Sequence, residues 1–94
     1  MEQLKLSRTD GGESSLLKVD GVFVAVGITP NSQPYEGLVE MDHGYIIAGE
    51  NGETSVPGIL AAGDVRTKQL RQIVTAVSDG ANAVTSAERY LTKA

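Results

Sequence analysis

The stretch at residues 56–84, VPGILAAGDVRTKQLRQIVTAVSDGANAV, decides the fold of this protein. It begins with an apolar run that ends in Gly-Asp, continues through a short polar bridge, and passes into a long helical pattern. In open α/β sheets, ligands bind beyond the carboxyl ends of the strands, where a strand passes into a helix. The stretch therefore predicts an α/β fold, and it raises the question of whether Asp64 contacts a ligand.

The helical pattern after the polar bridge is the clearest element of the sequence. Its apolar residues recur at spacings of three and four and form one stripe, which must pack against something. The glycine in this pattern, Gly80, costs about 1 kcal/mol relative to alanine, and we interpret it as a packing site rather than a ligand contact. Asp79 and Glu88 fall on the polar side of the predicted helix. The stripe consists of Leu70, Ile73, Val74, Val77, Ala81, Val84 and Leu91.

Asp64 has two interpretations that its position alone does not separate. A carboxylate at the end of a buried strand can accept hydrogen bonds from the hydroxyl groups of a sugar or polyol. The preceding glycine, Gly63, would let such a ligand approach the backbone. Alternatively, Asp64 only satisfies free backbone donors within its own turn, as aspartate commonly does.

The first part of the chain predicts three short strands that form a meander. Alternating patterns occupy residues 2–8 and 15–19, and an apolar run occupies residues 22–27, with Gly-containing turns between them. Residues 28–42 hold two prolines and no sustained pattern, so we expect a connector there. Two further strands are predicted at residues 44–49 and 58–63.

Composition excludes several classes of function. The chain has 94 residues and a net charge of −4, which argues against binding to a phosphate backbone. It has no cysteine, and this excludes a disulfide scaffold, a thiolate zinc site and a redox dithiol within the chain. Its single histidine, His43, is predicted to be a turn residue, and we expect no metal site. No segment is apolar enough to span a bilayer or act as a signal peptide, so we expect no membrane contact and a cytoplasmic location.

The motifs of the C-terminal half carry a resemblance to a known family. TSVPGILAAGDV, followed by RQIVTAVSDGANAVTSAERYL, resembles the C-terminal end of the bacterial-type, low-molecular-weight thioredoxin reductases. DGVFVAVGITPN resembles the segment where that family's chain crosses from the pyridine-nucleotide domain to the FAD domain, and GYI resembles its next strand. The resemblance implies that residues 1–30 end the NAD(P)-binding domain, that residues 31–43 connect, and that residues 44–94 belong to the FAD-binding domain.

The resemblance also implies roles for individual residues. Gly63 and Asp64 fall on the family's second FAD motif, where the aspartate hydrogen-bonds the ribityl chain. Arg71, Gln72 and Ile73 fall on the segment that meets the isoalloxazine ring at the start of a helix. The positive end of a helix dipole suits the negative charge of reduced flavin. Without the resemblance, Arg71 would be interpreted as a solvated helix charge.

The implied activity is thioredoxin-disulfide reduction, in which electrons pass from NADPH to FAD, to a cysteine pair and to thioredoxin. The sequence contains neither the Gly-rich phosphate turns nor the Cys-x-x-Cys pair that this activity needs. The resemblance therefore implies a part of the enzyme that carries one wall of the FAD site, holds no NADPH site or catalytic residue, and is inactive alone.

Other functions remain open at the level of sequence. One is a part of a related flavoprotein reductase, such as the flavin subunit of alkyl hydroperoxide reductase or a ferredoxin-NADP reductase; these often carry lysine at the position of Arg71. Another is a noncatalytic interaction module. Because the helix stripe and the edges of residues 22–26 would lack partners in so short a chain, we also expect a homo-oligomer.

Overall fold

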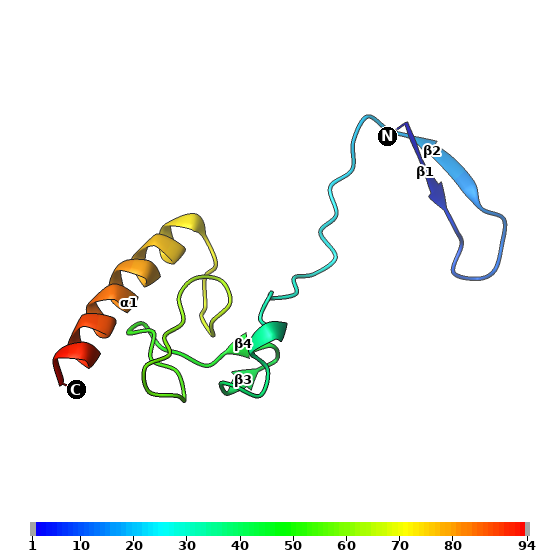
Figure 1. Cartoon of the computed structure of the whole chain (residues 1–94). Helices are drawn as coiled ribbons and strands as arrows, with labels where there is room; N and C mark the ends of the chain where they lie inside the picture. Colours follow the sequence, from blue (N-terminus) through cyan, green and yellow to red (C-terminus); the bar gives the residue numbers. More distant parts are fainter. Residues whose placement is uncertain (1, 94) are drawn as a thin grey trace.

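The computed structural model describes residues 2–93 and shows an elongated molecule that measures 65 × 27 × 20 Å. A β-hairpin occupies one end, and an extended segment leads from it to a group of loops that lie against one long helix (Figure 1). The predicted α/β class is confirmed: the described residues form two small antiparallel sheets and a long C-terminal helix.

The hairpin at the N-terminal end consists of β1 (Gln3–Leu6) and β2 (Ser15–Lys18). The strands are antiparallel, with Leu4 opposite Leu17. Within the turn, the Gly12 N–H donates to Asp10 Oδ1 at 2.9 Å, and Gly11 takes a φ of +82° that glycine adopts without strain. The two strands predicted on either side of this turn are thus confirmed.

The third strand predicted for the meander, at residues 22–27, does not form. This segment has no strand, and the side chains of Phe23 and Val26 are 102% and 94% exposed. A strand is held by hydrogen bonds to a neighbour and by burial of its apolar face. Within residues 2–93 the segment has neither, so its apolar residues lie along an extended and open chain.

The connector predicted for residues 31–43 contains short regular elements. A 3₁₀ turn, η1 (Gln33–Tyr35), is followed by β3 (Met41–Asp42), which pairs antiparallel with β4 (Tyr45–Ile46). His43 lies in the turn between these two strands, as predicted, and its φ is +51°. β4 covers only part of the strand predicted at residues 44–49.

The strand predicted at residues 58–63 is reduced to a single bridge. Leu60 pairs with Glu53 in an isolated antiparallel bridge, and the Ala61 N–H donates to the Gly52 carbonyl at 2.8 Å. A buried parallel strand needs neighbours on both sides, and within residues 2–93 this segment has only the short antiparallel contact with residues 52–53. The small core consists of Val39, Ile46, Ala48 and Ala61.

The long C-terminal helix, α1 (Ile73–Lys93), is confirmed over 21 residues. Its packed face is the opposite of the expected one. Asp79 and Ser86 are its buried residues, and the Ser86 hydroxyl donates to the Asn51 carbonyl at 2.6 Å. The polar side therefore faces the loops, and the apolar stripe faces outward: Leu70, Ile73, Val74, Val77, Ala81, Val84 and Leu91 are all exposed.

Two further properties of α1 bear on the predictions. A Cβ placed on Gly80 would meet no atom within 4 Å among the described residues, so the interpretation of Gly80 as a packing site is wrong for this structure. Between residues 2 and 93, the structure has no helix with the length and apolar character needed to cross a membrane.

Candidate functional site

The residues predicted to bind a cofactor meet where the loops pass into α1. Asp64, Arg71, Gln72 and Ile73 all line one open hollow of about 550 Å³, together with Ala76 and Val77 of the helix. Gly63, the remaining predicted residue, precedes Asp64 and does not line the hollow itself. Four of the five predicted positions are thus brought onto one surface.

Gly63 forms the turn that places Asp64 beside the helix. Its φ is +87°, a conformation that disfavours any residue with a Cβ, and its N–H donates to Asp79 Oδ2 at 2.8 Å. The Asp64 side chain is exposed, and its carboxylate makes no hydrogen bond or ion pair within residues 2–93. The interpretation that Asp64 satisfies donors in its own turn therefore has no support, and the carboxylate is available as an acceptor.

Arg71 is fixed by three contacts. Its Nε donates to the Asp64 carbonyl and its Nη2 donates to the Arg66 carbonyl, both at 3.0 Å. Its guanidinium also lies 3.8 Å from the centre of the Tyr45 ring, within the range of a cation–π interaction. Arg71 is half-buried and is not the solvated helix charge that its position alone suggests.

The start of α1 offers backbone donors to the hollow. The Gln72 N–H donates to Thr75 Oγ1 at 2.9 Å, so Thr75 acts as the returning half of a capping box. The first N–H groups of a helix have no intrahelical partner. Those of Ile73 and Val74 make no hydrogen bond among the described residues, and they carry the positive end of the helix dipole.

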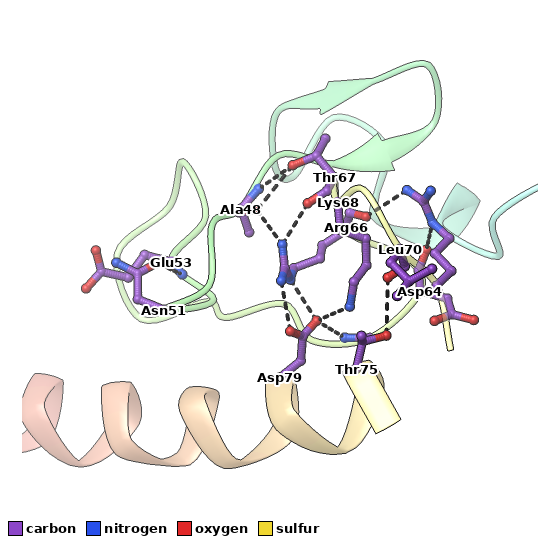
Figure 2. A network of polar contacts seen from close by, with 12 residues as sticks. Ala48, Asn51, Glu53, Asp64, Arg66, Thr67, Lys68, Leu70, Thr75 and Asp79 are labelled. Atoms are coloured by element: carbon purple, nitrogen blue, oxygen red, sulfur yellow. Dashed lines mark hydrogen bonds and ion pairs between the residues drawn. The ribbon is translucent and has the colours of Figure 1, made fainter. Parts of the chain in front are cut away.

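A buried ion cluster lies directly behind this surface, and sequence reasoning missed it. Asp79 accepts from Arg66 Nε at 2.7 Å, from Arg66 Nη2 at 2.8 Å and from Lys68 Nζ at 2.8 Å (Figure 2). The three side chains are only 6–7% exposed. The sequence contained one signal for this cluster. Two cations, Arg66 and Lys68, shortly precede α1, and they face the side of the helix on which Asp79 was predicted to be solvated.

Within this cluster, Asp79 and Arg66 shift each other's pKa. The hydrogen bonds from Arg66 lower the pKa of Asp79 well below its usual range, and those from Lys68 and the Gly63 N–H act in the same direction, while burial opposes them. The hydrogen bond to Asp79 likewise raises the pKa of Arg66. Asp79 and Arg66 are therefore charged at neutral pH, and the carboxylate offsets the desolvation of the cations packed against it.

The cluster also ties separate segments to one another. Arg66 Nη1 donates to the Ala48 carbonyl at 3.2 Å and to the Thr67 carbonyl at 2.7 Å, and Thr67 Oγ1 donates to the Ala48 carbonyl at 3.2 Å. Figure 2 shows Arg66 between the carbonyl of Ala48 on one side and Asp79 of the helix on the other. One helix residue thus sets the position of both loops relative to α1.

The chemical capacity of the site is to bind rather than to react. It offers an exposed carboxylate, a guanidinium held by its neighbours, N–H groups at a helix start that have no partner in the described part of the chain, and apolar side chains from Ile73 and Val77. Within residues 2–93 no cluster of histidine, aspartate or glutamate has the arrangement of a metal site. The groups suit a ligand with hydroxyl groups at one end and hydrogen-bond acceptors at the other.

Comparisons with known proteins show which family the chain resembles. The sequence profile of the pyridine nucleotide-disulphide oxidoreductase family matches residues 1–80. A thioredoxin reductase of Listeria monocytogenes is 48% identical over 88 residues, which cover 93% of this chain and 28% of that protein. The thioredoxin reductase of Bacillus subtilis is 49% identical over 81 residues, which cover 85% of this chain and 26% of that protein.

Solved structures give the same result. The thioredoxin reductase of Streptococcus pyogenes matches 99% of this chain with a TM-score of 0.78 and 37% identity, and 31% of that protein is covered. The Lactococcus lactis enzyme in its FR conformation matches with a TM-score of 0.76 and 34% identity over the same shares. The chain thus spans less than a third of the relatives it matches. From the profile match over residues 1–80 and these likenesses, the chain belongs to the pyridine nucleotide-disulphide oxidoreductase family and is similar to a part of the thioredoxin reductases.

Proposed function

We propose that this chain forms one wall of the FAD site of a thioredoxin-disulfide reductase. The observation that carries the proposal is the convergence of Asp64, Arg71, Gln72 and Ile73 on one hollow at the start of α1. In the whole protein, NADPH would reduce FAD, and electrons would then pass through a cysteine pair to thioredoxin. The chain holds no cysteine, so it contributes binding and orientation, and we expect it to be inactive alone.

The residues present fit a flavin. The Asp64 carboxylate, which has no partner among residues 2–93, is an acceptor that suits the hydroxyl groups of the ribityl chain. Gly63 beside it has no side chain, which lets a ligand approach the backbone closely. The Arg71 guanidinium and the N–H groups at Ile73 and Val74 suit the pyrimidine edge of the ring, where reduced flavin carries negative charge. When bound, FAD supplies the electron-transfer chemistry, and these residues hold and orient it.

The arrangement of the chain supports a division into two domains. The hairpin of β1 and β2 lies apart from the loops that pack against α1, and an extended segment joins them (Figure 1). We infer that residues 1–30 end the NAD(P)-binding domain and cross over, that residues 31–43 connect, and that residues 44–94 belong to the FAD-binding domain. In this assignment the NADPH site lies outside the chain.

Arg71 favours a thioredoxin reductase over a related flavoprotein reductase. Its planar guanidinium donates to two carbonyl groups and lies over an aromatic ring at the same time. A lysine has no planar fork that could hold both carbonyl groups in this fixed geometry. The relatives with high identity are also named thioredoxin reductases. We therefore propose thioredoxin as the partner of the whole protein and a cytoplasmic location for it.

A chimera tests the proposal. In it, this chain replaces the matching segment of the Bacillus subtilis thioredoxin reductase, to which it is 49% identical. We expect the purified chimera to retain the flavin absorbance after desalting and to reduce thioredoxin with NADPH. In the chimera, Asp64→Ala should lower the FAD content, whereas Glu88→Gln on the exposed surface of α1 should not.

Two results would contradict the proposal. The first is a chimera that melts cooperatively and has a native circular dichroism spectrum but contains no FAD. The second is an Asp64→Ala chimera with unchanged FAD affinity, which would remove Asp64 from the site. If the chimera does not fold, co-expression of this chain with the remainder of the Bacillus subtilis enzyme provides a second measurement, because a flavin site completed by both pieces should hold FAD.

A further inference from the structure

Arg71 is held in one orientation before any ligand binds. Its Nε and Nη2 atoms, along one side of the guanidinium, donate to the carbonyl groups of Asp64 and Arg66. Its Cζ atom lies over the Tyr45 ring, 3.8 Å from the ring centre. An arginine has five N–H donors in a rigid plane. Those on Nη1 make no hydrogen bond among the described residues, and Arg71 lines the hollow.

We propose that Tyr45 is a positioning residue that fixes the Arg71 guanidinium so that its free end meets an acceptor oxygen of the ligand in the hollow. The side edge of the guanidinium is used by two carbonyl groups, and the ring prevents the plane from turning away from them. The positioning follows from contacts within the chain. Only the identity of the ligand, a flavin, rests on the proposed function.

The backbone around Tyr45 makes it suitable for this role. β4 is hydrogen-bonded to residues 65–67. The Ile46 N–H donates to the Val65 carbonyl at 2.8 Å, and the Thr67 N–H donates to the Ile46 carbonyl at 2.8 Å. The ring and the two carbonyl groups that hold Arg71 therefore belong to one hydrogen-bonded unit. This unit holds the guanidinium through two hydrogen bonds along its side edge and through the Tyr45 ring beneath its Cζ atom.

The expected effect on binding is a change in preorganisation. A long side chain that is free before binding loses rotamer freedom when a ligand orders it, and this loss weakens affinity. A cation–π contact at a half-buried site is worth a several-fold change in the population of the held orientation. Loss of the Tyr45 ring should therefore weaken flavin binding by about three- to tenfold, while a phenylalanine should keep the effect because it keeps the aromatic face.

The positioning is tested by NMR on the full chain without flavin. The Arg71 Nε–H signal, assigned by its absence in Arg71→Lys, should be shifted upfield by the Tyr45 ring and should exchange slowly with water. Tyr45→Phe should retain both properties. Tyr45→Leu should abolish the shift and accelerate the exchange, while its backbone amide spectrum keeps the native pattern. An unchanged Nε–H signal in Tyr45→Leu would overturn the proposal.

The same signal decides the question in the wild-type chain if Tyr45→Leu does not fold. A wild-type Arg71 Nε–H at the chemical shift of a free arginine, with fast exchange, would show that the ring does not hold the group and would overturn the proposal.

The contact between the positioned Arg71 guanidinium and the flavin is tested in the chimera described above. The FAD dissociation constant should rise about three- to tenfold in Tyr45→Leu and return to the parent value in Tyr45→Phe. If the Nε–H signal responds and the FAD dissociation constant does not, the positioning stands and the flavin contact of Arg71 under the proposed function is contradicted. If FAD affinity falls without any change at the Nε–H, the effect does not pass through Arg71, and the positioning role is overturned.

Discussion

Asp79 is the single residue on which the geometry of the candidate site depends. Its carboxylate accepts from the Gly63 N–H, from Arg66 and from Lys68, and so joins the turn before Asp64 to the helix that follows Arg71. Without this carboxylate, two buried cations would lose their counter-charge. Removing one partner of a buried ion pair destabilises a protein strongly, because the other charge stays buried without compensation. Replacing the whole pair by apolar residues does not leave such a charge.

Asp79→Asn should destabilise the chain by about 3 to 5 kcal/mol. The amide keeps the size of the side chain but leaves Arg66 and Lys68 buried without a negative charge. Urea unfolding followed by circular dichroism measures the loss. Glu88→Gln, which removes an exposed carboxylate from the same helix, is the matched control and should change stability by less than about 0.5 kcal/mol. Equal stability of the Asp79→Asn variant and the wild-type chain would mean that the cluster is not formed in solution.

The same cluster predicts how stability depends on pH. The pKa of Asp79 in the folded chain lies below its ordinary value of 3.8, so the unfolded chain takes up this proton first as the pH falls. The stabilisation is fully present above about pH 5 and is lost progressively below about pH 4, as the pH falls toward and through the folded pKa. Urea midpoints measured between pH 7 and pH 2.5 should show this decline in the wild-type chain, and a smaller one in Asp79→Asn.

A second acidic group has to be separated from this effect. The hydrogen bonds from Arg8 and then from the Gly12 N–H lower the pKa of Asp10 to about 2, although this group is exposed in the hairpin. Asp10→Asn introduced into both backgrounds removes its titration. The difference in decline between wild type and Asp79→Asn should persist in the Asp10→Asn background, and its disappearance there would assign the acid dependence to the hairpin.

Among the elements, those with a local signal were predictable from the sequence. α1 follows from its helical period, and the hairpin follows from alternation around a Gly-rich turn. The strands expected at residues 22–27 and 58–63 depend on neighbouring strands that residues 2–93 do not supply. Both segments have the apolar pattern of a strand, but neither forms one.

The candidate site divides in the same way. Asp64, Arg71, Gln72 and Ile73 flank one turn, and short sequence separation brings them together. The contacts of Asp79 with Arg66 and of Arg71 with Tyr45 join distant segments, and no periodicity indicates them.

Gly80 gives a test of how α1 packs. Glycine within a helix costs about 1 kcal/mol relative to alanine, and a Cβ at this position meets no atom within 4 Å among the described residues. Gly80→Ala should therefore raise the free energy of unfolding by about 0.5 to 1 kcal/mol. Gly63→Ala is the contrasting variant: its φ of +87° should make alanine destabilising by about 1 to 2 kcal/mol. A destabilising Gly80→Ala would show that this face of α1 is covered in solution.

At the scale of the whole molecule, α1 has one packed face and one open face. The packed face is held by buried polar groups, Asp79 and Ser86, whereas Ile73, Val84 and Leu91 are 86%, 69% and 72% exposed. Soluble monomers rarely expose a continuous apolar surface of this kind. The extended segment adds Phe23 and Val26 to the exposed apolar surface. The chain therefore has two apolar surfaces that another molecule can cover.

We expect the isolated chain to self-associate through the stripe of α1, because burial of these side chains is favourable and nothing within residues 2–93 covers them. Light scattering should give an average mass that rises with protein concentration. The double substitution Val77→Glu and Val84→Glu should shift the chain toward the monomer without loss of helix content, since both side chains are 67–69% exposed. Ser78→Glu with Asn82→Glu adds the same charge outside the stripe and should leave association unchanged. A wild-type chain that remains a monodisperse monomer at all concentrations and unfolds cooperatively would show that the stripe does not drive association.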